Sequence, residues 1–236
     1  MNLLFKNILY FTLLYLVFFI VDTIVKVNIE LTCLRYFTKS SLMLLLLLFY
    51  VVNQNEQYKS KMYLVVIAIC CFIIGDFFII DGKSKLFITV GAIFFAVAKI
   101  LYTIRFSNNN DFNILRLIPF LLFCFAYMSL VMLFIYNNLG VYFFPVLVYL
   151  FIVMITAQFA YLRKNNVNIT SYWLVIIGIV LSMFSDSITF LKEFYDPEIA
   201  YNEYTIMLFY GLSQYFIVVG LVKESTNFKK TKVNLS

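Results

Sequence analysis

Residues 173–191 read WLVIIGIVLSMFSDSITFL, an apolar stretch that contains a single acidic residue, Asp186. A helix needs about 20 residues to cross the ~30 Å hydrocarbon core of a bilayer, and this stretch has that length. An ionised carboxylate in hydrocarbon costs at least ~2.5 kcal/mol. The stretch therefore predicts a transmembrane helix, and it marks Asp186 as a residue that needs a partner, a proton or a function.

The composition of the whole chain supports the same interpretation. Of its 236 residues, 64% are hydrophobic and only 13% are charged, whereas soluble domains are roughly 45–50% apolar and about 25% charged. The other long apolar segments lack the strict alternation of a lipid-facing barrel strand. We therefore expect an all-α integral membrane protein, with a transmembrane domain over residues 1–224 and a short basic cytoplasmic tail at residues 225–236. A bundle of about eight transmembrane helices is expected near residues 7–25, 34–53, 62–80, 86–106, 114–136, 141–162, 172–191 and 204–222.

Basic residues predict how this bundle is oriented in the membrane. Lysine and arginine are in excess in cytoplasmic loops, and eleven of the 18 fall on the side that holds both chain ends, against six on the other side. We expect both termini in the cytoplasm, in a bacterial inner membrane or a plasma membrane. The acidic residues lean toward the far side, and Asp22, near the far end of the first expected helix, is grouped with them. The net charge of +6 is explained by this topology and does not indicate a nucleic-acid partner.

Three ionisable residues fall well inside the expected helices: Asp76, Lys99 and Asp186. Both aspartates lie about five residues before the outer ends of their helices, which places them at a similar depth, roughly 7 Å below the outer edge. Small residues recur at helical spacing beside each acid, and such residues let helices approach closely. We therefore expect both carboxylates to face the interior of the bundle. The small residues are Gly178, Ser182, Ser185 and Thr189 beside Asp186, and Ala68, Cys71 and Gly75 beside Asp76.

Two inward carboxylates admit three interpretations. If they share one cavity they cannot easily both ionise, so that one becomes a proton donor and the other stays a base, which is the minimum for acid–base hydrolysis. The two acids are also offset by four helices, the pattern of a weak parallel 4+4 repeat, and transporters build their sites between such halves. In the third interpretation the carboxylates are hydrated, hydrogen-bonded or paired with Lys99 for structural reasons alone.

Five further residues are candidates for substrate binding. Lys39 opens the second helix, where it could neutralise a carboxylate, hold a lipid phosphate or anchor the helix at the interface. Lys99 either extends toward the cytoplasmic headgroups or faces inward, on the same helical face as Tyr102. Tyr210 and Gln214 lie on one stripe of the last helix, and a glutamine there more often forms a helix–helix hydrogen bond than a catalytic group.

The chain contains no histidine. This removes the commonest zinc ligand and the commonest general base at neutral pH, and it argues against a His–zinc hydrolase or a Ser–His nucleophile. The four cysteines form no CxxC pair, and we interpret them as small apolar residues. We predict no metal and no cofactor.

Five segments, in the same order and over most of the chain, resemble those of the YhhN-like membrane proteins, a family that includes the lysoplasmalogenases. Each segment alone is weakly specific, and their order over eight helices carries the resemblance. FTKSSLMLLLLL (37–48) is similar to the family's Lys-Pro opening of the second helix, FIIGDFFII (72–80) to its Gly-Asp segment, TVGAIFFAVAKILYTIRF (89–106) to its Gly-Phe-His-Tyr helix, IGIVLSMFSDSITFLKEF (177–194) to its Ser-Asp segment, and LFYGLSQYFIVVGL (208–221) to its Tyr-Gln ending.

The resemblance implies hydrolysis of the vinyl ether bond of lysoplasmalogens, with a membrane lipid or lysophospholipid as the partner. The products would be a fatty aldehyde and a glycerophospho-headgroup. On the matching positions, Asp76 and Asp186 would be the acid and the base, and Lys39 would be a phosphate or carboxylate partner. Two positions depart from the family pattern, because Lys99 stands where the family typically has His and Ser40 stands where it has Pro.

Overall fold

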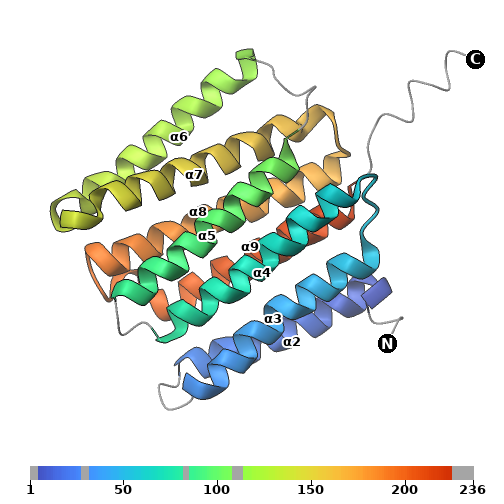
Figure 1. Cartoon of the computed structure of the whole chain (residues 1–236), viewed down its shortest axis with the longest axis horizontal. Helices are drawn as coiled ribbons and strands as arrows, with labels where there is room; N and C mark the ends of the chain where they lie inside the picture. Colours follow the sequence, from blue (N-terminus) through green and yellow to red (C-terminus); the bar gives the residue numbers. More distant parts are fainter. Residues whose placement is uncertain (1–4, 28–31, 82–84, 108–113, 225–236) are drawn as a thin grey trace, which may run out of the picture.

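A computed structural model describes residues 5–27, 32–81, 85–107 and 114–224. The described residues form eight long helices, each long and apolar enough to cross a membrane, so the expected all-α bundle is confirmed (Figure 1). Short 3₁₀ helices occupy some of the connections. The long helices are α2 (Ile8–Val27), α3 (Thr32–Asn53), α4 (Lys59–Asp81), α5 (Lys85–Phe106), α6 (Ile114–Ile135), α7 (Phe143–Leu162), α8 (Ile169–Phe194) and α9 (Asn202–Val222), and the 3₁₀ helices are η2 (Tyr136–Asn138), η3 (Gly140–Tyr142), η4 (Arg163–Asn165) and η5 (Ile199–Tyr201).

The helix ends agree with the sequence-based expectations to within three residues. The largest difference is at α8, which begins three residues before and ends three residues after the expected range 172–191, because polar residues at both ends continue the helix. Parts of the expected loops, residues 82–84 and 108–113, and the expected basic tail, residues 225–236, lie outside the described residues.

The eight helices lie side by side with alternating direction, so α2 begins and α9 ends at the same end of the bundle (Figure 1). We call this the terminal end, and the other the opposite end. Helices α2 and α3 form one edge of the bundle and α6 and α7 the other, with α4, α5, α8 and α9 between them. Large apolar side chains on the outer faces are exposed, as a lipid environment requires.

Glycines allow the two closest helix pairs to form. A Cβ atom added at Gly178 of α8 would lie 2.8 Å from the carbonyl oxygen of Ser213 on α9. A Cβ atom added at Gly75 of α4 would lie 3.0 Å from the carbonyl oxygen of Gly91 on α5 and 2.6 Å from the ring of Phe95. Small residues let membrane helices approach closely. The expected close packing beside Asp76 and Asp186 is therefore confirmed at these two glycines.

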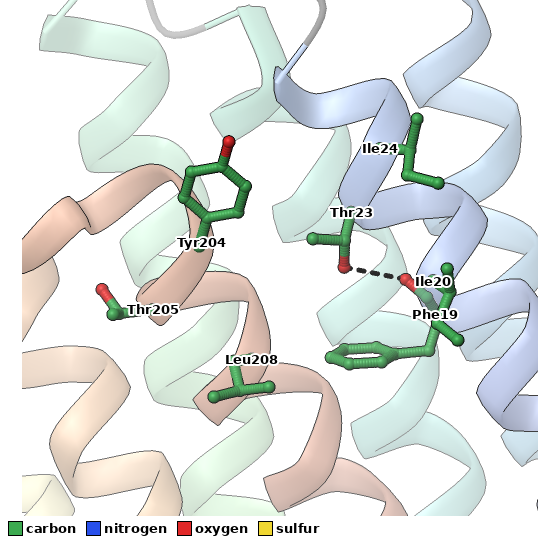
Figure 2. Close-up of a pocket in the computed structure, with 7 residues that line it drawn as sticks. All are labelled: Phe19, Ile20, Thr23, Ile24, Tyr204, Thr205 and Leu208. Carbon is green, nitrogen blue, oxygen red and sulfur yellow. Dashed lines mark hydrogen bonds between the residues drawn. The ribbon is translucent and has the colours of Figure 1, made fainter.

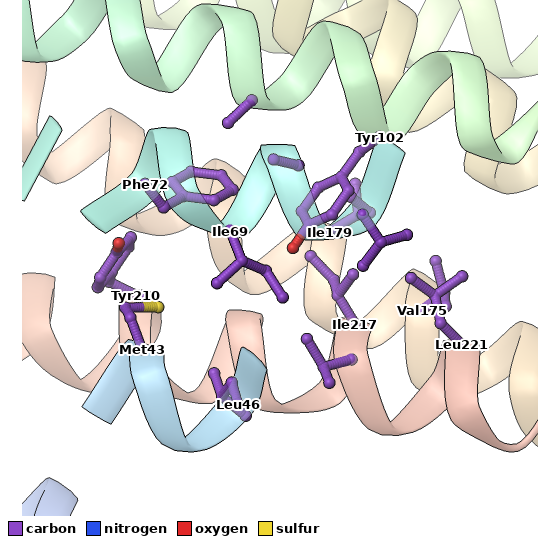
Figure 3. Packing of buried hydrophobic residues seen from close by; sticks show 14 of the residues in the cluster. Met43, Leu46, Ile69, Phe72, Tyr102, Val175, Ile179, Tyr210, Ile217 and Leu221 are labelled. Carbon is purple, nitrogen blue, oxygen red and sulfur yellow. The ribbon is translucent and has the colours of Figure 1, made fainter. Parts of the chain in front are cut away.

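The core of the bundle is apolar and aromatic, and it draws side chains from both edges and the centre. Figure 3 shows its members from α3, α4, α5, α8 and α9. Phe72 of α4 lies at its middle, with ring centroids 5.3 Å from Phe95, 5.7 Å from Tyr102 and 6.2 Å from Tyr210. Such aromatic pairs contribute about 0.5–1.5 kcal/mol each beyond their burial. This aromatic cluster places two predicted site tyrosines on the inner faces of α5 and α9.

The terminal end is closed by a buried set of charges that we call the Arg–Glu network, formed by Glu56, Arg105, Arg163 and Glu224. Arg105 donates to Glu56 Oε1 from Nε at 2.9 Å and from Nη2 at 2.6 Å, and Nη2 also donates to Glu224 Oε2 at 2.8 Å. Arg163 Nη2 donates to the same Glu224 oxygen at 2.8 Å. Both arginines lie at helix ends on the side of the chain termini, as the sequence predicts, but they are buried, at 2% and 1% exposed. They join the α3–α4 connection, α5, α7 and the end of α9.

Candidate functional site

Asp76 lies on α4, five residues before the helix ends at Asp81, and it is completely buried. The Nζ atom of Lys39, on α3, lies 2.8 Å from its Oδ1. The hydroxyl of Tyr210, on α9, donates a hydrogen bond to its Oδ2 at 2.8 Å. The Lys39 ammonium also lies 5.2 Å from the centre of the Tyr210 ring, a cation–π distance. We call these three residues the Asp76 triad. A buried carboxylate is tolerated when it is paired and hydrogen-bonded, and this triad provides both.

Asp186, on α8, is held by a second set of the same residue types. The Nζ atom of Lys99, on α5, lies 2.9 Å from its Oδ2, and the hydroxyl of Tyr149, on α7, donates to its Oδ1 at 3.0 Å. Lys99 Nζ also donates to Ser182 Oγ at 2.6 Å and lies 6.0 Å from the centre of the Tyr149 ring. We call Asp186, Lys99 and Tyr149 the Asp186 triad. Of the two sequence-based alternatives for Lys99, the inward one is observed.

The two triads join the two halves of the chain, α2–α5 and α6–α9. Asp76 receives Lys39 from its own half and Tyr210 from the other half. Asp186 receives Tyr149 from its own half and Lys99 from the other half. Each acid is therefore held by one contact across the boundary between the halves, as a site built between repeats would be. The repeat in the sequence itself stays a prediction.

A third polar contact links the helices that carry the triads. The hydroxyl of Tyr102, on α5, donates to Gln214 Oε1, on α9, at 3.2 Å. Tyr102 lies one helical turn from Lys99, and Gln214 lies one turn from Tyr210. The structure therefore places all seven predicted site residues in the two triads and one further buried hydrogen bond. Lys39 is bound to a carboxylate rather than left at the interface. Their catalytic and substrate-binding roles stay predictions.

The two carboxylates are not equally far from their helix ends. Because α8 continues to Phe194, Asp186 lies eight residues before the end of its helix, about 12 Å at 1.5 Å per residue. Asp76 lies five residues, about 7.5 Å, before the end of α4. The sequence predicted equal distances because it placed the end of α8 at residue 191, and that prediction is wrong. Each acid is paired with its own lysine.

Asp22 also needs a new description, because it is not a surface acid of the far side. It lies on α2, five residues before the helix ends at Val27, and it is 0% exposed. Thr38 Oγ1, on α3, donates a hydrogen bond to its Oδ1. Within the described ranges its Oδ2 is buried and has no hydrogen-bond partner. Since Thr38 precedes Lys39, Asp22 belongs to the region of the Asp76 triad.

A groove of about 280 Å³ lies between α2 and α9 near the opposite end of the bundle (Figure 2). Its walls are mostly apolar, and Ile20, Ile24 and Leu208 on its rim are exposed to the surroundings of the bundle. Its inner wall includes Phe19, which packs where a Cβ atom at Gly211 would lie 2.3 Å from the ring. Gly211 directly follows Tyr210 of the Asp76 triad. The groove is lined by Phe19, Ile20, Thr23, Ile24, Tyr204, Thr205 and Leu208.

Two members of these sites were not predicted as site residues. Tyr149 completes the Asp186 triad from the middle of an apolar run, VLVYLFIVM at 146–154, where its hydroxyl was the only polar signal. Asp22 was visible in the sequence as an acid inside an expected helix, but it was grouped with the acidic residues of the far side. Over the described part of the chain, no group of three or more His, Cys, Asp or Glu side chains is arranged to hold a metal ion.

Comparison with known proteins agrees with the sequence resemblance. The family model of the YhhN family matches residues 34–221, which cover α3 to α9 almost completely. No curated protein and no solved structure matches the chain. The match includes both triads but leaves out α2, and with it Asp22.

Proposed function

Because the chain belongs to the YhhN family, we propose that this integral membrane protein is a lipid hydrolase that cleaves the vinyl ether bond of lysoplasmalogens. The observation that carries the proposal is the pair of triads. Two buried carboxylates, Asp76 and Asp186, are each held by a lysine and a tyrosine inside the bundle. Intramembrane acids of this kind are costly and mark functional sites by default.

Vinyl ether hydrolysis suits such groups. A proton is first transferred to the outer alkene carbon, which leaves an oxocarbenium ion on the carbon that bears the ether oxygen. Water adds to that carbon and loses a proton, and the resulting hemiacetal collapses to an aldehyde and a free glycerol hydroxyl. In sum, R–CH=CH–O–R′ and H₂O give R–CH₂–CHO and HO–R′. Asp76 and Asp186 are the proposed proton-transfer groups, and a fixed carboxylate also stabilises the cationic intermediate.

The lysines and tyrosines of the triads position the carboxylates in this proposal. Lys39 and Lys99 hold the acids in place and balance their charge, since their ammonium groups lie 2.8 and 2.9 Å away. Tyr210 and Tyr149 fix the other oxygen of each acid. Side chains locked by such contacts hold reacting groups to within the narrow tolerance that catalysis needs. Tyr102 and Gln214 connect the helices between the triads.

Purified protein reconstituted with a lysoplasmalogen is expected to release a long-chain aldehyde. The matched control substrate is the single-chain lipid with a saturated ether at the same position, which has no alkene carbon to protonate and should remain intact. Aldehyde is measured by derivatisation and mass spectrometry. The proposal fails if the protein releases no aldehyde, or if Asp76→Asn and Asp186→Asn variants both retain full activity.

The α2–α9 groove is the proposed position of the lipid's hydrocarbon chain, because it is apolar and opens toward the membrane. Filling it with Leu208→Trp is expected to raise KM about 10-fold, equivalent to ~1.4 kcal/mol of binding, with kcat unchanged because binding of the chain is equal in ground and transition state. Leu133→Trp, an exposed residue on α6, is the matched control and should leave both constants unchanged. Equal KM values in the two variants would place the chain elsewhere.

A second candidate function is a proton- or ion-coupled transporter. The observation that favours it is the contact of each acid across the two halves, since alternating access moves one half against the other. This candidate predicts proton-dependent solute uptake by vesicles that contain the protein. Aldehyde release without such uptake would decide in favour of the hydrolase.

A further inference from the structure

In the proposed reaction a triad carboxyl group protonates the alkene carbon, and the attacking water needs a further group that is free to hold it. The contacts within the two triads leave little room for such a water. Asp76 Oδ1 faces Lys39 and its Oδ2 accepts from Tyr210. Asp186 Oδ2 faces Lys99 and its Oδ1 accepts from Tyr149. The two lysine contacts are close ionic contacts without hydrogen-bond alignment, yet they still occupy the oxygens. All four carboxylate oxygens of the triads are thus engaged.

Asp22 is different, because one of its oxygens is open. Thr38 donates to Oδ1, while Oδ2 is buried and has no hydrogen-bond partner among the described residues. No ion pair joins this carboxylate to any of the basic side chains that the structure describes. A buried acceptor left without a donor costs roughly 1–3 kcal/mol in free energy. A cost of this kind is retained where the group has a task.

The position of Asp22 brings it to the Asp76 triad. Asp22 and Asp76 each lie five residues before the end of their helices, about 7.5 Å from the opposite end of the bundle. Thr38, the hydrogen-bond donor to Asp22, directly precedes Lys39 of the triad.

The groove lies on the same stretch of α2. Phe19 and Thr23, on either side of Asp22 along the helix, both line it (Figure 2). A lipid chain in this groove would therefore lie next to the segment that carries Asp22. Asp22 does not itself line the groove, but among the described residues it is the buried carboxylate with an open oxygen on this stretch of α2.

From this geometry we propose that Asp22 is a third catalytic carboxylate, which holds the attacking water through Oδ2 and accepts its proton. The inference rests on the proposed hydrolase function and adds a residue to it. As the water oxygen forms its bond to the oxocarbenium carbon, one water O–H bond breaks and its proton passes to Asp22 Oδ2. When the hemiacetal collapses, Asp22 gives this proton to the departing glycerol oxygen, which restores its carboxylate. The hemiacetal hydroxyl loses its proton to the triad carboxylate that had protonated the alkene carbon, which restores the acid. Asp22 lies on α2, which is outside the part of the chain that matches the family model.

The melting temperature tests whether Asp22 Oδ2 lacks a partner, independently of any reaction. In Asp22→Asn the amide oxygen can still accept from Thr38, and a buried charge without an ion pair is removed, so the melting temperature should equal or exceed that of the wild type. Asp76→Asn leaves the buried Lys39 ammonium group without a counter-charge and should melt at a lower temperature. If Asp22→Asn melts as low as Asp76→Asn, Asp22 is a paired structural residue and the inference is overturned.

The catalytic role is tested by kinetics on lysoplasmalogen. Asp22→Asn is expected to lower kcat by about 10²-fold, the lower range for loss of a general base, with KM unchanged. Asp22→Glu keeps a carboxylate and should retain more activity than Asp22→Asn. Asp196→Asn makes the same chemical change at an exposed position after α8 and should have no effect. Full kcat in Asp22→Asn would overturn the inference, whereas an inactive wild type would overturn the proposed function and leave the melting comparison valid.

Discussion

The Asp76→Asn variant is expected to lose vinyl ether hydrolysis by at least about 10²-fold, because an amide neither donates nor accepts the transferred proton as a carboxyl group does. It is also expected to be less stable, since Lys39 would be left as a buried cation that is 6% exposed and has no counter-charge. Breaking a buried pair from one side costs about 3–5 kcal/mol. Activity is measured as aldehyde release, and stability as the melting temperature of the purified protein.

A double variant separates these two effects. In Lys39→Met/Asp76→Asn both charges are gone, so the stability lost in the single variant should largely return, because replacing both partners of a buried pair is often neutral. Activity should remain lost. If the double variant regains activity along with stability, Asp76 acts only through the integrity of the bundle and has no part in proton transfer.

The Arg105→Met variant is expected to be strongly destabilised. Arg105 is buried and makes three hydrogen bonds to two carboxylates, so its removal leaves Glu56 without its guanidinium partner and Glu224 with Arg163 alone. The expected cost is about 3–5 kcal/mol in the free energy of unfolding. Lys164→Met is the control, because Lys164 lies beside Arg163 but is exposed. Equal melting temperatures for the two variants would contradict the importance of the network.

The same network predicts acid sensitivity. Burial alone raises the pKa of the Glu224 carboxyl, but the nearby Arg105 and Arg163 guanidinium groups outweigh it and hold the pKa below its usual range. A carboxyl whose pKa is lower in the folded state than in the unfolded state stabilises the fold at higher pH. That contribution is complete above the unfolded value, about 4.3, and is lost as the pH falls through the folded value. Glu224→Gln should flatten the melting-temperature profile in that range.

Much of the fold could be predicted from the sequence, because each apolar run is as long as a membrane is thick and is closed by polar residues. The inward direction of Asp76 and Asp186 also followed from the small residues beside them. Those residues set which face can approach a neighbour, and Gly75 and Gly178 do contact α5 and α9. Helix periodicity and segment length are local properties, so a single sequence carries them.

The pairing of the charged groups could not be predicted in this way. Which lysine meets which carboxylate depends on the arrangement of helices far apart in the chain, such as α5 against α8, and no local pattern specifies it. The distance of an acid from the end of its helix is a sound measure of its depth, but the expected end of α8 lay three residues before the observed end. By the same criterion the partner of Asp76 in depth is Asp22, at five residues from the end of α2. The ion pairing of Arg105 and Arg163 was likewise not predicted, because positive charges near helix ends normally serve topology.

For the proposed hydrolase, the α2–α9 groove has a consequence for how the kinetics must be expressed. The rim of the groove is exposed on the side of the bundle, so in the proposed reaction the substrate would reach it by diffusion within the plane of the bilayer. The relevant concentration would then be the mole fraction of substrate among membrane lipids. Adding inert lipid at constant bulk substrate should therefore slow the reaction by surface dilution. Adding buffer at constant lipid composition should leave the rate per enzyme molecule unchanged.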